Sequence, residues 1–320
     1  MAIVTDRALV EGIIQDAAKK KVSIALFCTA STWNNEAILK AAQNFGRKHG
    51  IKNVPIIAGF TGSYKHMPQL RRTNTAGNLK AGFNTILGSL DALCGKKDSP
   101  YYDVMVMPQL DHGDPVKDKW IFEEGIERLA GVMFDCQSYS YDENVAMTKK
   151  YCKEFGGRIM VESAMEQLAV LGNVNHKDAD EHYVEHAVSY MKETGADFIV
   201  ADLGTEQQST STDSKYLKER ARMLTQAFGK EMLVLHGVSS LKPEQIVGLG
   251  DDGVVKVNMW TRIVREAGIY AYDKLSQRKG DFEKDFNAVD PQIYMNDLCE
   301  YATNMMEEHL GYFNYANLAK

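Results

Sequence analysis

The chain has 320 residues, enough for one large domain or two small ones. Hydrophobic residues make up 44% of it and the formal net charge is -6, so a sizeable core can be buried, and binding to nucleic acid or to an anionic membrane is not expected. No apolar stretch approaches the roughly 20 residues needed to cross a bilayer. The five cysteines are odd in number and lack CxxC spacing, which argues against a disulfide framework and against a structural zinc site.

Residues 1–21 have the pattern of an amphipathic helix that ends in lysines. They lack the charged, apolar and small-residue regions of a secretion signal. We therefore expect a leading helix over about 1–21 and a cytoplasmic location.

The rest of the chain alternates apolar runs of strand length with helical stretches. The runs begin in chain order at residues 22, 54, 104, 131, 158, 197, 232 and 254. Eight such units in about 250 residues match a closed (β/α)8 TIM barrel, because a parallel sheet must be covered by its helices. No GxGxxG follows the first run, which argues against a dinucleotide fold. Residues 277–320 add a helical extension, and since no linker is present we predict a single TIM-barrel domain over 1–320.

The third run, VMVMPQLDHGD over residues 104–114, ends in Asp111 and His112. Neighbouring side chains leave an extended backbone in roughly opposite directions, so one can bind a metal while the other handles a substrate proton. His236 ends the seventh run, and residues that follow barrel strands converge on one pocket. Two such histidines near carboxylates are typical of a catalytic divalent-metal site. The alternative is an acid that caps a loop beside a structural histidine.

Several stretches, in their order and spacing, resemble the class II, metal-dependent fructose- and tagatose-bisphosphate aldolases. They are IIAGFTGSYKH, QLDHGD, GVMFDCQSYSYDENV, IMVES, TGADFIVADLGT, LVLHGVSS, VVKVNMWT and DPQIYM. The likeness runs almost end to end, and it identifies the chain as a divergent member. It implies an aldehyde-lyase that breaks or forms a carbon–carbon bond through an enediolate stabilised by a metal ion.

The resemblance also implies roles for individual residues. Asp111 matches the acid that exchanges a proton with the substrate hydroxyl, and His112 and His236 match two metal ligands. Asn258 matches the side chain that holds the enediolate. The residues expected to bind substrate are Gly237, Ser239, Thr261, Glu162 and Ser63. A metal makes a lysine Schiff base unnecessary, so Lys256 is interpreted as structural.

The sequence departs from the family where a third histidine is expected. Gln207 occupies that position and Glu206 precedes it. Zinc is the metal that the resemblance implies, but an oxygen donor such as Gln207 or Glu206 suits Mn²⁺ or Mg²⁺. Either one of these oxygens is a ligand or metal binding is weakened. His182 and His186, at i and i+4, offer another ligand pair, although their charged helix is expected to face solvent.

A second departure concerns phosphate. Gln208 and Gln292 replace a glycine and an arginine of the family pattern, and VSSLK replaces a glycine-rich turn. Phosphate sites depend on approachable backbone N–H groups and on guanidinium clamps, so these changes argue against a bisphosphate. The predicted activity is reversible aldol cleavage of a ketose or ketose phosphate other than a standard bisphosphate.

Two other functions stay open. The same enediolate can be reprotonated, which would make the protein a metal-dependent sugar isomerase or epimerase. A barrel that has lost its metal would instead be a non-catalytic subunit supporting an active partner. The resemblance implies a homo-oligomer, either a dimer or a tetramer. The apolar helical face within residues 294–313 would then dock on a neighbour, or else pack on its own barrel.

Overall fold

A computed structural model describes residues 2–170, 181–284 and 293–320. Within them, parallel strands close into a barrel in sequence order, each paired with its chain neighbours and β8 paired with β1. The strands are β1 (Ile24–Cys28), β2 (Val54–Thr61), β3 (Val104–Gly113), β4 (Gly131–Phe134), β5 (Met160–Ala164), β6 (Phe198–Val200), β7 (Leu233–Leu235) and β8 (Val254–Met259). The predicted (β/α)8 barrel is confirmed.

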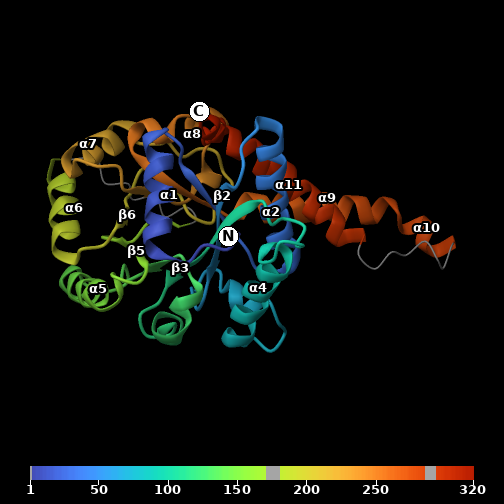
Figure 1. Ribbon diagram of the computed structural model, residues 1–320, viewed down its shortest axis with the longest axis horizontal. Helices are drawn as coiled ribbons and strands as arrows, with labels where there is room; N and C mark the ends of the chain where they lie inside the picture. The colour runs from blue at the N-terminus through green and yellow to red at the C-terminus, as the bar shows by residue number, and fades with distance from the viewer. Residues whose placement is uncertain (1, 171–180, 285–292) are drawn as a thin grey trace.

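Helices surround the strands (Figure 1). The longer ones are α1 (Arg7–Lys19), α2 (Thr32–His49), α4 (Leu79–Cys94), α5 (Tyr141–Phe155), α6 (Glu181–Thr194), α7 (Lys218–Phe228), α9 (Thr261–Gln277) and α11 (Ile293–Tyr312). Side-chain caps satisfy first N–H groups of α1, α2, α4 and α5, as where Ser31 begins α2 and Ser140 forms a capping box with Glu143 at α5. The shorter helix α3 (Gln69–Arg72) lies between β2 and α4, and the shorter helix α10 (Lys279–Lys284) follows α9.

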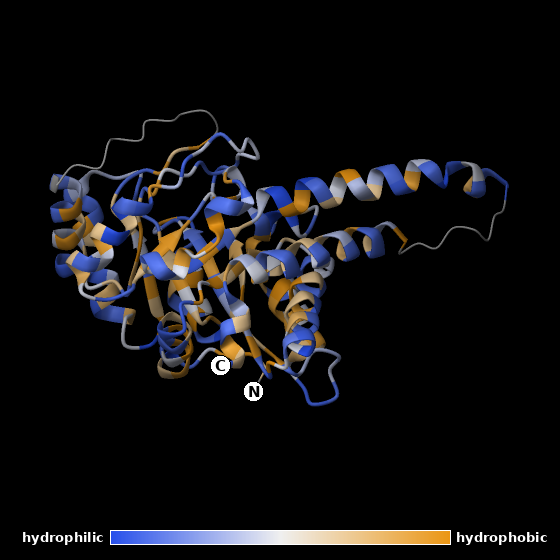
Figure 2. Ribbon diagram, turned by 90° about the horizontal axis from the view of Figure 1, so that it is seen from above, coloured by the Kyte–Doolittle hydropathy of each residue, from blue (hydrophilic) through white to orange (hydrophobic). Residues whose placement is uncertain are grey.

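The strands are buried along almost their whole length, which is why they were recognisable as continuous apolar runs. Figure 2 shows hydrophobic residues concentrated in the central strands and hydrophilic residues on the outward faces of the helices. The sheet is therefore covered on both faces, as a parallel barrel requires.

The helical segments expected after β3 and β7 are short. β3 leads into one π turn, η1 (Ile121–Gly125), and a 3-10 turn, η2 (Ile126–Arg128). β7 leads into η3 (Val238–Ser240), α8 (Pro243–Ile246) and η4 (Leu249–Asp252). Glycines at positive φ flank these last turns and prevent a continuous helix.

The leading helix is shorter than the expected 1–21 because the residues before it pair with a strand. The Val4 N–H donates to the Val106 carbonyl at 2.9 Å, and the Val106 N–H donates to the Ala2 carbonyl at 2.7 Å. Asp6 then caps α1 by accepting from the Leu9 N–H. The N-terminal segment thus extends the hydrogen bonding of β3 before α1 begins.

The C-terminal extension runs out from the barrel along α9 and α10 and returns along α11 (Figure 1). α11 packs against α2 and α9, and Ala302, Met306 and Leu310 belong to the main core. Of the two alternatives for its apolar face, packing on its own barrel is the one observed. η6 (Tyr315–Ala319) follows, and the Tyr315 hydroxyl donates to the Pro55 carbonyl at 3.0 Å. None of the helices in the described ranges is long and apolar enough to span a bilayer.

Candidate active site

The site begins with an irregularity at the end of β3. His112 has a φ of 46°, and the pairing of β3 with β4 shifts register between Leu110 and Gly113. Asp111 and His112 consequently both line one cavity at the carboxyl ends of the strands. The expectation that their side chains leave in opposite directions was wrong, because the left-handed residue turns the second side chain back toward the first.

This cavity is open to solvent and is lined by a few convergent polar side chains, as small-molecule sites commonly are. The predicted site residues that line it are Asp111, His112, Gln207, His236, Gly237, Ser239, Asn258 and Thr261. Three predicted residues, Glu162, Glu206 and Ser63, do not line it. The convergence of residues from β3, β7 and β8 and from the loop after β6 agrees with the expectation for a barrel.

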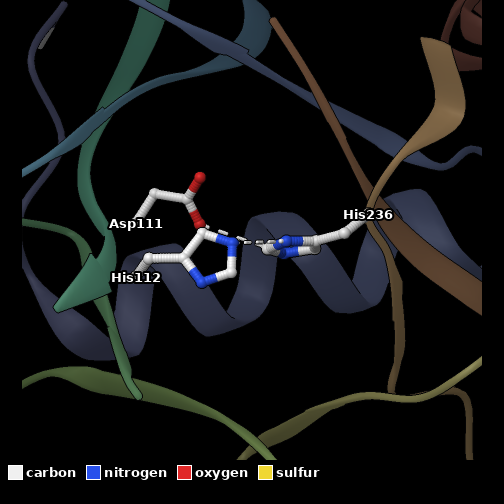
Figure 3. Close-up of side chains that lie close together, drawn as sticks. All are labelled: Asp111, His112 and His236. Carbon is white, nitrogen blue, oxygen red and sulfur yellow. Dashed lines mark hydrogen bonds and ion pairs between the residues drawn. The ribbon is translucent and has the colours of Figure 1, made fainter. Parts of the chain in front are cut away.

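The rings of His112 and His236 lie next to each other, and a nitrogen of each ring points toward the other ring (Figure 3). The Nε2 atom of His112 and the Nδ1 atom of His236 are 3.2 Å apart, with the rings nearly perpendicular at 87°. On their far sides, His112 Nδ1 lies 2.7 Å from Asp135 Oδ2 and His236 Nε2 lies 3.2 Å from Glu162 Oε1. Each carboxylate accepts a hydrogen bond from its ring, and in a neutral ring this leaves the inner nitrogen with a lone pair directed toward the other ring.

The donors in this site fit a divalent cation. Two nitrogens bound tetrahedrally to one zinc ion would be roughly 3.4 Å apart, close to the observed separation. Asp111 adds an oxygen, and ligand atoms of Asp111, His112 and His236 all lie within 4.8 Å of one another. Two lone pairs that face each other at this distance are favourable only with a cation or a proton between them.

Burial and charge set the protonation of these groups. Burial lowers the pKa of His236 to about 4, so the ring is neutral near pH 7, as a ligand must be. Burial also acts on His112, but the charges of Asp111 and Asp135 outweigh it and raise the pKa of that ring. Burial opposes ionisation of Asp135, yet its hydrogen bond to His112 lowers the pKa of the carboxyl.

Asp111 is held beside the rings by Asn258. The Asn258 Nδ2 atom donates to Asp111 Oδ1 at 3.1 Å, and Cys28 Sγ lies 3.7 Å from Asp111 Oδ2. The Asn258 Oδ1 atom is buried and finds no hydrogen-bond partner among the described residues. A carboxyl group and an amide are thus fixed side by side, where one can exchange a proton and the other can bind a polar substrate atom.

Glu162 lies beneath the cavity, where it supports His236. It forms an ion pair with Lys256, and Gln109 Nε2 donates to its Oε2 atom at 3.1 Å. With His236 on its other oxygen, the carboxylate is fully engaged, so it orients the ring rather than facing the cavity. The ion pair also supports the structural interpretation of Lys256.

Gln207 and Glu206 differ in their placement. Gln207 lines the cavity, and its Oε1 atom accepts a hydrogen bond from the Tyr64 hydroxyl at 2.9 Å. The backbone of Glu206 lies close to Gly237, whose φ is 70° and where a Cβ would lie 2.8 Å from the Glu206 carbonyl oxygen, and the Glu206 N–H donates to Ser240 Oγ at 3.0 Å. Within the described part of the chain, the carboxylate of Glu206 does not join the group formed by Asp111 and the two histidines.

The remaining candidates lie further out. The Ser63 N–H donates to Asp118 Oδ2 at 3.1 Å, and Arg71 lies against the Ser63 hydroxyl, so this serine belongs to the loop after β2. His182 and His186 are exposed on α6, as their charged surroundings indicated. Gln292 lies outside the described residues.

Tyr64 is the site residue that the sequence did not reveal. Its ring stacks on His112 with centroids 4.2 Å apart and an angle of 8° between the planes. Burial raises the pKa of its hydroxyl, so the group stays protonated and donates to Gln207. Tyr64 lies in a long loop whose folding over the barrel has no sequence period. Asp135 directly follows β4, and its bond to His112 is visible only in the structure.

Comparison with known proteins agrees with this geometry. The family description "Fructose-bisphosphate aldolase class-II" matches residues 9–318. The chain belongs to the class II fructose-bisphosphate aldolase family. Metal dependence is a property of this class, and the group formed by Asp111, His112 and His236 offers a site for the ion.

Relatives within the class II family are distant. A fructose-bisphosphate aldolase of Treponema pallidum is 28% identical over 163 residues, which cover 45% of this chain and 48% of that protein. A 6-phospho-5-dehydro-2-deoxy-D-gluconate aldolase of Bacillus licheniformis is 29% identical over 191 residues, covering 56% of this chain and 60% of that protein. These two matches therefore span only about half the length of those relatives. The Bacillus velezensis protein of the same name is 25% identical over 331 residues, which cover 100% of this chain and 98% of that protein.

Solved structures show the same fold over the whole chain. The Fructose-bisphosphate Aldolase (Fba) of Campylobacter jejuni superimposes with a TM-score of 0.72 at 16% identity, covering 99% of this chain and 96% of that one. The YdjI aldolase of Escherichia coli K12 superimposes with a TM-score of 0.66 at 17% identity, covering 99% of this chain and 100% of that one. At these identities the likeness supports the barrel and not a particular substrate.

Proposed function

We propose that this protein is a divalent-metal-dependent class II aldolase that reversibly cleaves a ketose or ketose phosphate. The observation that carries the proposal is the pair of facing nitrogens of His112 and His236, 3.2 Å apart, with Asp111 beside them. A bound cation would supply Lewis-acid polarisation of the substrate carbonyl, which stabilises the negative charge that develops when the carbon–carbon bond breaks.

The chain's own residues handle the proton and the orientation of the substrate. In the cleavage direction Asp111 accepts the proton of the hydroxyl beside the breaking bond, because its carboxylate lies in the cavity and is already oriented by Asn258. The amide of Asn258 binds the oxygen on which charge develops. Asp135 and Glu162 hold the two rings in the tautomers that leave the inner nitrogens available.

The substrate we propose is not a standard bisphosphate. Gly237, Ser239 and Thr261 line the cavity and form the proposed site for one phosphate or polar head group. Gln208 adopts a φ of 61°, so its backbone keeps a glycine-like conformation, but its side chain adds bulk to the cavity lining. The name of the Bacillus relatives describes a sugar acid with one phosphate, a class of substrate that agrees with this proposal.

The metal, the location and the assembly are further parts of the proposal. Zinc follows from the family resemblance, and Mn²⁺ or Mg²⁺ from the oxygen donor at position 207. A cytoplasmic location follows from the N-terminal sequence, and a homodimer or homotetramer from the resemblance. Light scattering of the purified protein measures the assembly, and a monomeric mass would contradict it.

The activity is tested with metal-free protein loaded in turn with Zn²⁺, Mn²⁺, Mg²⁺ and Co²⁺ and incubated with a panel of ketoses, ketose phosphates and sugar acids. We expect cleavage into two smaller carbonyl compounds. Asp111→Asn should lower kcat by about 10²- to 10⁴-fold while one equivalent of metal stays bound, because it removes the proton acceptor and leaves both histidine ligands in place.

Three outcomes would contradict the proposal. One is the absence of cleavage with all four metals. The second is a product with an unchanged carbon count, which would identify an isomerase or epimerase. The third is purified protein that holds no stoichiometric ion and co-purifies with a second barrel protein, which would identify a non-catalytic subunit.

A further inference from the structure

The cation site proposed above offers three protein ligand groups, Asp111, His112 and His236, but the proposed mechanism also uses Asp111 for proton transfer. A catalytic zinc ion takes three or more protein ligands, and harder ions such as Mg²⁺ take six ligands, most of them oxygens. If Asp111 is used for proton transfer, only the two histidine nitrogens remain. Another donor must then come from the lining of the same cavity, to which Gln207 belongs.

Gln207 is tied to the histidine pair by one aromatic ring. The ring of Tyr64 stacks flat on His112, with centroids 4.2 Å apart, and its hydroxyl donates to Gln207 Oε1 at 2.9 Å. His112 is itself fixed by Asp135. The position of the amide oxygen is therefore set relative to the His112 ring by contacts at both ends of Tyr64.

The chemistry of the amide supports a ligand role. A carbonyl oxygen has two lone pairs, and Tyr64 uses one of them, which leaves the second for a cation. Glutamine has three rotatable side-chain bonds, and ordering them in a free side chain would oppose metal binding. The hydrogen bond from Tyr64 orders this side chain before the ion arrives.

We propose that Gln207 supplies its amide oxygen to the cation, and that Tyr64 is the positioning residue that holds this oxygen in place. This inference rests on the proposed function, since it takes the histidine pair to be the cation site. It selects Gln207 over Glu206, because Gln207 lines the cavity and Glu206 does not. Replacing a nitrogen donor by an oxygen donor moves the preference of the site away from Zn²⁺ and toward Mn²⁺ and Mg²⁺.

The first test is Tyr64→Phe, which keeps the ring on His112 and removes only the hydroxyl. We expect the Kd for Mn²⁺, measured by calorimetry on the full-length protein, to rise by about tenfold, the size of effect seen when support of a ligand is lost. The matched control is Tyr101→Phe. The Tyr101 hydroxyl donates to Glu36 at 3.0 Å and does not line the cavity, so its removal should leave the Kd unchanged.

The second test is Gln207→His, which exchanges the oxygen donor for a nitrogen donor. After dialysis against equal concentrations of Zn²⁺ and Mn²⁺, elemental analysis should show a bound zinc-to-manganese ratio about tenfold higher than in the unchanged protein. Gln207→Ala should weaken the binding of both ions. The electron paramagnetic resonance spectrum of bound Mn²⁺ should change in both variants, because one ligand has changed.

The inference is overturned if Gln207→Ala and Gln207→His bind both metals as the unchanged protein does. It is also overturned if Tyr64→Phe has the same Kd as the Tyr101→Phe control. Failure of the proposed function would give a different result. The protein would bind one equivalent of metal and the variants would change metal binding as expected, but no ketose or sugar acid would be cleaved. The metal measurements and the product assay therefore separate the two.

Discussion

His112 shows how one residue conformation creates the candidate site. Its φ of 46° is uncommon for a residue other than glycine, and this type of strain concentrates at functional sites. The left-handed turn lets two consecutive residues of β3 reach the same cavity, which a regular strand forbids. Contacts on two sides maintain it, the carboxylate of Asp135 and the stacked ring of Tyr64.

A prediction at the residue scale concerns Asp135, which is bonded to His112. Replacing it with Asn removes the charge that fixes the tautomer of His112, so the affinity for a divalent metal should fall by about 10- to 100-fold. Calorimetric titration of the metal-free variant with Zn²⁺ and Mn²⁺ measures this. The neighbouring Gln137→Ala variant is the control, because it removes a hydrogen bond to Asp135 but not the charge. An unchanged affinity in Asp135→Asn would show that His112 is held by other contacts.

At the scale of elements, helices α3 and α4 can approach closely because Gly82 in α4 has no side chain. A Cβ at Gly82 of α4 would overlap the carbonyl oxygen of Leu70 in α3. α3 belongs to the loop that carries Tyr64 and Met67 over the cavity. The position of this loop is therefore coupled to the packing between α3 and α4.

We expect Gly82→Ala to lower the free energy of unfolding by about 1–3 kcal/mol, because backbone must move to make room. Gly88→Ala, in the same helix, is a matched control. No atom lies within 4 Å of its added Cβ, and the change should raise the free energy of unfolding by about 0.5–1 kcal/mol. Urea denaturation measures both, and equal effects of the two substitutions would contradict the close packing.

The docking of α11 should depend on pH through His309. This ring is buried, its Nδ1 atom donates to the Met305 carbonyl at 2.7 Å, and Glu308, Arg262 and Glu266 surround it. Burial lowers its pKa below the usual 6.5. Below pH 6.5 the unfolded chain takes up a proton that the native ring resists, so stability falls as the pH drops through that value and no such loss occurs above it.

His309→Gln should show a smaller loss of stability between about pH 7.5 and pH 5 than the unchanged protein, because the titrating ring is gone. Urea denaturation midpoints at the two pH values measure the difference. His182→Gln is the control, since the His182 side chain is 78% exposed. If the acid sensitivity of the His309 variant matches that of the control, His309 is not the group responsible.

At the scale of the whole molecule, closure of the barrel is what assembles the cavity. β8 pairs with both β7 and β1, so Asn258 at its end comes beside Asp111 at the end of β3. In the same way, His112 and His236, which are 124 residues apart in the chain, come together with His112 Nε2 3.2 Å from His236 Nδ1. An ion bound at this point would link strands from opposite parts of the sequence.

Metal binding should consequently stabilise the entire fold. A ligand at 100 times its Kd adds about 2.7 kcal/mol to the free energy of unfolding, which corresponds to a rise in Tm of roughly 4 °C for a protein of this size. Calorimetric melting of the protein with and without a chelator measures the rise. The double variant His112→Ala with His236→Ala should show none, and a similar rise in that variant would mean that the metal binds elsewhere.

The sequence by itself determined the barrel, because strands buried on both faces must be apolar along their length and because eight helical stretches must cover them. It also determined that Asp111, His112, His236 and Asn258 share one end of the sheet, since all four follow strand ends. The sequence named Gln207 and Glu206 as alternative oxygen donors without deciding which one lines the cavity, and it gave no indication of Tyr64. Their placement depends on loops with no hydrophobic period.

Only the tertiary structure decided how the site is organised. It placed Asp111 and His112 on the same side through one left-handed residue, stacked Tyr64 on the imidazole, and put Glu162 beneath His236. It also packed α11 against α2 and α9. Each outcome is set by contacts between segments far apart in the chain, and local propensity contains no information about such contacts.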